Sequence, residues 1–168
     1  METAITVVII VGILLVGMLG LLQNAMSMQS SVSQSTVEMQ SRLEERTRTN
    51  ILPVTTAVDP VLGTWVDVTI RNTGTTKLAD YAKWDVILQY TDVLGTARTV
   101  WVPYTTGWGK QIYQVAPGVP EVFDPGIFNS GEEMTIRVNV AVAIQSGSTN
   151  LATIATPNGI TASTVFTR

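Results

Sequence analysis

Acid–base chemistry in this chain would have to come from carboxylates, lysines and tyrosines, because its 168 residues include neither cysteine nor histidine. That absence excludes thiol nucleophiles, Ser-His-Asp catalysis, disulfides and most zinc sites. Glu132 and Glu133 are adjacent carboxylates, but neighbouring residues that enter a strand point to opposite faces of the sheet. We interpret them as solvated turn charges, and we expect no catalytic residue and no enzymatic activity.

Metal and nucleic-acid sites are not expected either. Asp80, Asp85 and Asp92 lack the tight Asp-x-Asp-x-Asp-Gly spacing that gathers oxygen ligands around calcium. The formal net charge is −3, and the seven basic residues after Thr49 include no run that could neutralise a phosphate backbone. The sequence therefore predicts no metal, no cofactor and no nucleic-acid partner.

Four tryptophans could form a stacking platform for sugars, or they could belong to the core and to contacts between subunits. Trp65, Trp84, Trp101 and Trp108 are spread over separate predicted strands and a loop, which favours the second interpretation. We take Trp101, Trp108 and Tyr113 as candidates for contacts between neighbouring head domains.

The elements that position these residues begin with an apolar run. Residues 4–22, AITVVIIVGILLVGMLGLL, hold no charge, and Thr6 is their only polar side chain. As a helix they would span a little under the roughly 30 Å of a bilayer's hydrocarbon core. Only Met1, Glu2 and Thr3 precede the run, without the basic leader and A-x-A-like site of a secretory signal peptide. We expect either a mature N-terminus left by removal of a leader or an uncleaved N-terminal anchor.

The helix is expected to continue through residues 23–48, because Gln23 to Thr47 contain neither proline nor glycine. Apolar residues here recur at spacings of three, four or seven, which makes a narrow stripe suited to packing against other helices. This part is amphipathic, and small residues in the apolar part would let helices approach closely. The residues expected to pack in a helical bundle are Val8, Val11, Gly12, Leu15, Gly17, Met18, Leu22, Ala25, Val32, Met39 and Leu43.

Residues 49–168 read as one all-β domain. WVDVTIRN, WDVILQY, RTVWVPY and GEEMTIRVNV are strand-like runs separated by turns, and the Asn-Gly pair after Pro157 predicts a closing hairpin. The segment between Thr105 and Pro125 is expected to be a surface loop that carries a short strand. The predicted fold class is α+β: a long hydrophobic helix over residues 1–48 and an Ig-like antiparallel β-sandwich head over residues 49–168.

This arrangement resembles the type IV pilin superfamily. Within it, the segments WVDVTIRNTGTTKL, NSGEEMTIRVNV and TPNGITASTVF are most similar to archaellins and archaellum accessory proteins. The resemblance implies a membrane-inserted precursor, a prepilin-type peptidase, an assembly ATPase with its platform, and a filament whose core is the N-terminal helices. Bacterial pilins carry glutamate at the fifth mature position, whereas Ile5 stands here and the acid is Glu2, which favours the archaellin side.

No Asn-x-Ser/Thr sequon occurs in the chain, so we expect no conventional N-glycan, and O-linked sugars remain open. Two functions fit these observations. The chain is expected to be the structural subunit of an extracellular, homo-oligomeric cell-surface filament that serves motility. Alternatively, it is a membrane-anchored accessory protein or an adhesive pilin whose head binds an envelope component.

Overall fold

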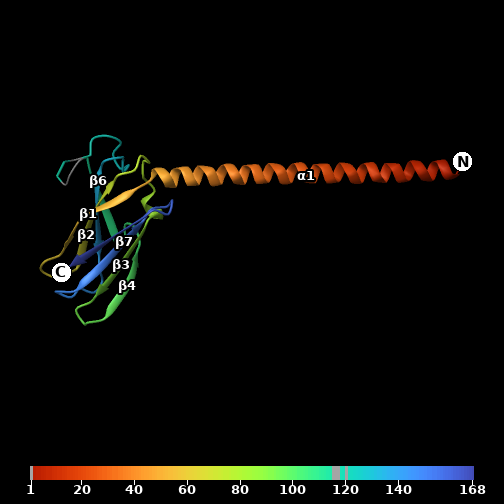
Figure 1. Ribbon diagram of the computed structural model, residues 1–168. Helices are drawn as coiled ribbons and strands as arrows, with labels where there is room; N and C mark the ends of the chain where they lie inside the picture. The colour runs from red at the N-terminus through yellow and green to blue at the C-terminus, as the bar shows by residue number, and fades with distance from the viewer. Residues whose placement is uncertain (1, 115–117, 120) are drawn as a thin grey trace. The chain divides into compact units, whose positions relative to one another are not determined.

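The computed structural model describes residues 2–114, 118–119 and 121–168, with the backbone alone for residues 2–4, 6 and 8. A single helix, α1 (Glu2–Arg48), occupies the first part of the chain (Figure 1). Its 47 residues give a length of about 70 Å at 1.5 Å per residue. The predicted continuation of the helix through the polar stretch is confirmed. The chain divides into two units, residues up to Leu43 and Glu44–Arg168.

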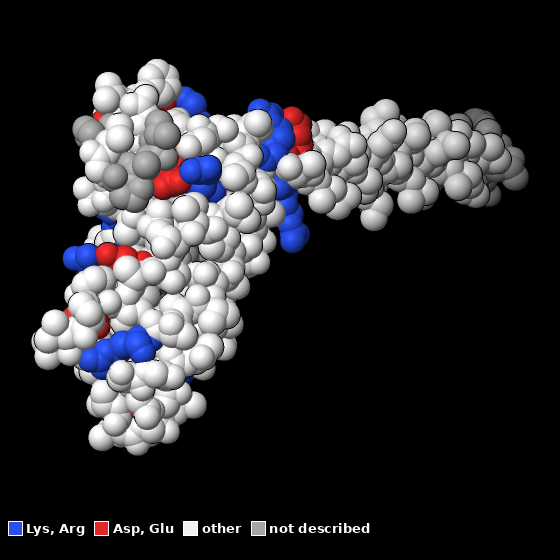
Figure 2. All heavy atoms as spheres, turned by 60° about the vertical axis from the view of Figure 1, so that its left-hand side comes forward, with Lys and Arg blue, Asp and Glu red and all other residues white. Residues whose placement is uncertain are grey.

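Apart from Glu2, the charged residues of α1 are confined to its last part. After the acid at Glu2, the next charged residue is Glu38, so residues 3–37 form an uncharged helix surface. On the side that Figure 2 shows, the described part of this surface is white up to a cluster of red and blue side chains. By length and composition alone, Ile9–Arg48 is apolar enough to cross a membrane.

The second unit is built from two four-stranded antiparallel sheets, counted over the described residues (Figure 1). The first sheet has the order β1 (Ile51–Val58), β2 (Trp65–Asn72), β6 (Glu133–Asn139), β5 (Trp108–Tyr113). The second has the order β4 (Ala97–Val102), β3 (Asp85–Thr91), β7 (Thr149–Ala155), β8 (Thr161–Thr167), and a 3₁₀ turn, η1 (Tyr81–Lys83), precedes β3. The predicted β-sandwich head is confirmed.

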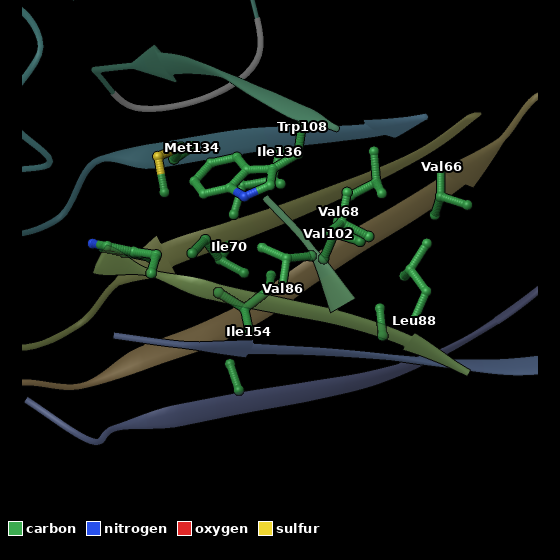
Figure 3. Packing of buried hydrophobic residues seen from close by; sticks show 14 of the residues in the cluster. Val66, Val68, Ile70, Val86, Leu88, Val102, Trp108, Met134, Ile136 and Ile154 are labelled. Carbon is green, nitrogen blue, oxygen red and sulfur yellow. The ribbon is translucent and has the colours of Figure 1, made fainter. Parts of the chain in front are cut away.

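The core lies between the inward faces of the two sheets (Figure 3). Alternation in β2 buries Val66, Val68 and Ile70, and these face Val86 and Leu88 of β3. Every one of these side chains is completely buried. The closing hairpin of β7 and β8 also forms as predicted, with Gly159 at positive φ in its turn.

Strand β1 is the element that the sequence pattern concealed. Pro53 lies within it and Pro60 closely follows it, yet residues 51–53 and 55–58 pair with β2. The register shifts between Pro53 and Thr55, which marks a bulge, and β1 lies at the edge of its sheet. A proline is tolerated at such a position because its missing N–H removes no central ladder bond. Strand β5 is the short strand expected between Thr105 and Pro125, where residues 115–117 and 120 lie outside the described residues.

The end of α1 is held by the turn that follows β2. The Arg48 carbonyl oxygen accepts hydrogen bonds from the backbone N–H groups of Thr75 and Thr76, at 2.8 and 3.4 Å. Gly74 allows this approach, because a Cβ there would collide with the Arg48 carbonyl and the Asn50 nitrogen. Carbonyls of the last helical turn, which have no partner within a helix, are thus satisfied by the head itself.

Candidate assembly surface

The surface of α1 is the largest apolar surface that the described residues leave uncovered. The isoleucine, leucine and valine side chains between Ile9 and Leu22 lie on every side of the helix, and each is between 49 % and 72 % exposed. A helix that is apolar all round has to be covered, either by lipid or by protein. The uncovered surface therefore implies a surrounding phase or a set of partners.

Most of the predicted packing residues follow one stripe of this helix, and Gly12 and Gly17 lie on either side of that stripe. Val11, Leu15, Met18, Leu22 and the later members follow one another at steps of three, four or seven, and all are exposed in the single chain. Gly12 and Gly17 have open space where a Cβ would stand. The Val8 side chain lies outside the described residues. The residues that continue the stripe toward the head, also exposed, are Ala25, Val32, Met39 and Leu43.

Hydroxyl groups in the middle of α1 are satisfied within the helix. Ser27 and Ser30 each donate to the backbone carbonyl three residues earlier, Asn24 and Ser27 respectively. Ser35 and Thr36 donate to the carbonyls four residues earlier, at 2.9 and 2.8 Å. Such back-bonded hydroxyls can enter an interface without needing a partner across it, so these four positions can also be buried against other helices.

The two adjacent glutamates are buried, which corrects the expectation of solvated turn charges. Glu132 is 5 % and Glu133 2 % exposed. Glu132 accepts a hydrogen bond from the Asn129 backbone N–H at 2.7 Å, and Glu133 forms an ion pair of 2.5 Å with Arg71 on the neighbouring strand. One carboxylate closes the turn before β6 and the other pairs across the sheet. Each has a structural partner, and they do not form a catalytic dyad.

The three aspartates lie in separate environments. Asp80 pairs with Lys83, Asp85 accepts a hydrogen bond from the Trp101 indole at 2.8 Å, and Asp92 is buried against Arg98. Nowhere in the described part of the chain do three acidic, histidine or cysteine side chains form a group that could hold a metal ion.

The tryptophans are not brought together into a platform. Trp84 and Trp108 are core residues, and Figure 3 shows the Trp108 indole between the sheets beside Met134 and Ile136. With 1 % of its surface exposed, Trp108 cannot touch a neighbouring head. Trp101 on the edge strand β4 is 57 % exposed and Tyr113 on β5 is half-buried, so these two candidates reach the surface, on different sheets. Trp65 is half-buried beneath the Arg137 guanidinium, 4.3 Å from its ring.

Two loops of the head share a short sequence that was not recognised among the predicted features. The β1–β2 loop reads Asp59-Pro-Val-Leu-Gly-Thr64 and the β3–β4 loop reads Asp92-Val-Leu-Gly-Thr96. In each, the buried aspartate accepts backbone hydrogen bonds from the leucine and the threonine, and the glycine adopts positive φ. A search for short internal repeats would have found the shared Val-Leu-Gly-Thr.

Known protein structures share this fold. No protein-family model and no curated protein sequence matches the chain. The archaellum periplasmic stator protein FlaG from Sulfolobus acidocaldarius is similar at 18 % identity and a TM-score of 0.52, over 70 % of this chain and 99 % of FlaG. Archaeal flagellin FlaB1 from Methanocaldococcus jannaschii is similar at 14 % identity and 0.53, over 71 % and 89 %. The archaeal flagellum of Methanospirillum hungatei strain JF1 is similar at 11 % identity and 0.50, over 99 % and 91 %.

Proposed function

We propose that this chain is the structural subunit of a helical cell-surface filament that serves motility, assembled through α1. The observation that carries the proposal is the length of uncharged, exposed helix. Its type IV pilin-like fold, shared with archaeal flagellins and with FlaG, supports a structural role in an archaellum-related assembly.

The uncharged length favours a protein bundle over lipid. Residues 3–37 extend about 52 Å at 1.5 Å per residue, whereas a bilayer's hydrocarbon core is about 30 Å thick. In a lone anchor the segment after Leu22 would stand outside the hydrocarbon with Met26, Met28, Val32 and Val37 in water. In a bundle of like helices the same segment is covered, and its back-bonded hydroxyls need no further partner.

Before assembly, the apolar residues 4–22 would hold the subunit in the membrane. By family resemblance, a prepilin-type peptidase would process the precursor, and an assembly ATPase and platform would extract the helix into the growing polymer. The mature polymer would then be extracellular, with the heads outside a core of helices.

A second candidate function is a membrane-anchored accessory protein whose head binds an envelope component or another filament protein. The match to FlaG, a periplasmic stator protein, supports it because that match covers 99 % of FlaG. The two functions differ in copy number: a filament subunit is abundant in sheared surface appendages, and an accessory protein stays with the membrane at low copy.

Electron microscopy of sheared cell-surface material, combined with mass spectrometry of the mature N-terminal residue, tests the proposal. We expect filaments composed of this chain. Val11→Asp should abolish them, because a dry helical core does not tolerate an unpaired ion, while Val11→Leu should leave them intact. Filaments of normal diameter from the Val11→Asp chain would contradict burial of α1, and recovery of the wild-type chain in membranes alone would favour the accessory function.

A further inference from the structure

The two Asp-(Pro)-Val-Leu-Gly-Thr loops lie at one end of the head. The loops follow β1 and β3, and the segment 143–144 forms backbone hydrogen bonds with both of them. The Ile144 backbone N–H donates to the Gly63 carbonyl at 2.9 Å, and the Val93 N–H donates to the Ala143 carbonyl at 3.0 Å. Because β1 begins next to the end of α1, its eight residues separate these loops from that junction by about 26 Å. We call the four aliphatic residues of the loops, Val61, Leu62, Val93 and Leu94, the apolar tip.

The apolar tip is exposed although its backbone is tightly held. Leu62 is 64 % and Leu94 77 % exposed. The Asp59 carboxylate accepts hydrogen bonds from the N–H groups of Val61, Leu62 and Thr64 and from the Thr64 hydroxyl. A rigid backbone that presents four aliphatic side chains to solvent loses little conformational entropy when they are buried by a partner.

The Arg168 side chain also holds the backbone of the β1–β2 loop in place, and we call it the brace. The Arg168 guanidinium donates to the carbonyls of Val61 and Ile144, which ties the loop to the segment beside it. This guanidinium covers Gly63, where a Cβ would stand 2.6 Å from one of its nitrogens. The brace holds the loop from its polar side and leaves the valine and leucine side chains uncovered.

The two sheets offer a partner very different outer faces. The outer face of the β1-β2-β6-β5 sheet carries two ion pairs, Asp67–Arg137 and Arg71–Glu133. The outer face of the β4-β3-β7-β8 sheet carries only one charge among its described residues, Asp85, which accepts the Trp101 indole hydrogen bond. Burying aliphatic side chains on the first face would desolvate charges, whereas burial on the second would not.

The uncharged face also has room for side chains. A shallow groove of about 430 Å³ crosses it, and its lining includes Gln89, Thr99, Leu151 and Val165. Leu151 and Val165 lie opposite each other on β7 and β8. Arg98 also lines the groove, but its guanidinium is paired with the buried Asp92. The groove thus offers aliphatic contacts without an unpaired charge.

We propose that the apolar tip of one head docks into this groove on the β4-β3-β7-β8 face of a second copy of the chain. The inference rests on the proposed function, because each head in a filament of identical subunits has identical heads as neighbours. A contact between two different patches of the same molecule leaves a free tip and a free groove at the ends of a row, and such contacts can continue into an open helical polymer.

Disulfide trapping in the full-length chain tests this contact directly, because the chain has no cysteine of its own. Leu62→Cys and Val165→Cys chains would be co-expressed, and sheared filaments would be oxidised mildly and analysed without reduction. We expect disulfide-linked dimers from the mixture. The matched control replaces Val165→Cys with Gln111→Cys, an exposed position on the opposite sheet, and should give few dimers.

The outcomes separate this inference from the proposed function. Absence of filaments from the wild-type chain would reject the function. Normal filaments with no Leu62→Cys/Val165→Cys dimers, or with equal trapping by Gln111→Cys, would reject the docking contact alone. If a fluorophore on Leu62→Cys in vesicle-reconstituted full-length chain were quenched by nitroxide-bearing phosphatidylcholine, a lipid surface would be the tip's partner, which would also reject the contact.

A second measurement uses a polar substitution that the isolated fold should tolerate. Leu62→Ser combined with Leu94→Ser should raise the subunit concentration needed for assembly about tenfold or more, because each leucine would lose its buried apolar contact. Val122→Ser, at an equally exposed aliphatic residue outside the tip, is the control and should leave this concentration unchanged. An unchanged concentration for the double variant would contradict the proposal.

Discussion

Asp59 and Asp92 show how single buried carboxylates organise this head. Each sits at the start of a tight loop and receives backbone N–H groups that would otherwise be unsatisfied. The Thr64 hydroxyl and the loop N–H groups lower the pKa of Asp59 from 3.8 to about 2, against the opposing effect of burial. The pKa of Asp92 is also lowered, by the hydrogen bonds from the Thr96 N–H and the Arg98 guanidinium.

These depressed pKa values predict acid sensitivity. A carboxylate whose pKa is lower in the folded state stabilises the fold above its unfolded pKa, and that stabilisation is lost as the pH falls toward the folded pKa. We expect the denaturation midpoint of the head to fall most steeply between about pH 4 and pH 2, followed by circular dichroism of the full-length chain in detergent. Asp59→Asn should lower the midpoint at pH 7 and flatten this acid limb. An unaltered acid limb would show that Asp59 is not a main source of the pH dependence.

Trp101 and Trp108 are expected to respond very differently to truncation. Trp108→Ala would open a cavity in the core, and such changes cost about 3–5 kcal/mol of unfolding free energy. Trp101→Ala removes an exposed ring and its hydrogen bond to Asp85, which should cost about 1 kcal/mol or less. Chemical denaturation of both variants measures the difference. Similar losses for the two would contradict the burial described for Trp108.

Residue-scale environments were the hardest feature to predict from sequence. The turn before Glu132 was recognised, but burial of the carboxylate depends on Asn129, and that of Glu133 depends on Arg71, more than sixty residues away. Local pattern cannot reveal a partner on a strand brought alongside by the fold. Trp108 was misjudged for a related reason, because its glycine-rich surroundings resembled a loop and concealed the pairing of β5 with β6.

At the scale of elements, α1 and the closing hairpin were predictable because their signals are local. Periodic apolar residues without proline or glycine determined the helical segment after Gln23, and the Asn-Gly pair determined the hairpin turn. Strand β1 was not predictable in this way, because Pro53 is acceptable only at a bulge on an edge strand. Edge position is a property of the assembled sheet.

Gly17 allows an element-scale test of helix packing. Nothing lies within 4 Å of a Cβ built at this position, so the single chain can accept a larger residue. We expect Gly17→Leu to prevent filament assembly while leaving helix content unchanged by circular dichroism, because bulk would separate closely packed helices. Gly17→Ala should assemble with a milder defect. Normal filaments from Gly17→Leu would place this side of α1 outside the bundle.

Gly74 provides a test of the junction between α1 and the head. Gly74→Ala would drive a methyl group against the Arg48 carbonyl, and forcing such an overlap costs about 1–3 kcal/mol. Gly109→Ala on β5 is the matched control, since its Cβ would meet open space. Urea denaturation should show a lower midpoint for Gly74→Ala alone. Equal midpoints would mean that the turn moves aside without loss.

At the scale of the whole molecule, the order of elements and the class of each could be read from the chain, whereas the pairing of distant strands could not. The sequence predicted a helix followed by a sandwich, and the structure has this order. The choice between filament and accessory roles depends on what covers α1, which is a property of the assembly.

An assembly held by α1 should resist salt and yield to detergent. Residues 3–37 carry no charge, so contacts among them contain no ion pair for salt to screen, and salts that strengthen burial would stabilise them. We expect filaments to remain sedimentable in sodium chloride or sulfate at roughly molar ionic strength, and to disperse in mild detergent. Release of subunits by salt alone would assign the main contact to the charged residues after Val37.

The back-bonded hydroxyls of α1 also have a mechanical consequence. Because the Ser35 and Thr36 hydroxyls are already satisfied by their own helix, they would supply no directional bond that fixes how far one helix lies along the next. At these two positions axial displacement would be opposed by dispersion forces alone, which vary smoothly with distance. A fibre could therefore yield slightly under load at these positions without breaking a hydrogen bond there.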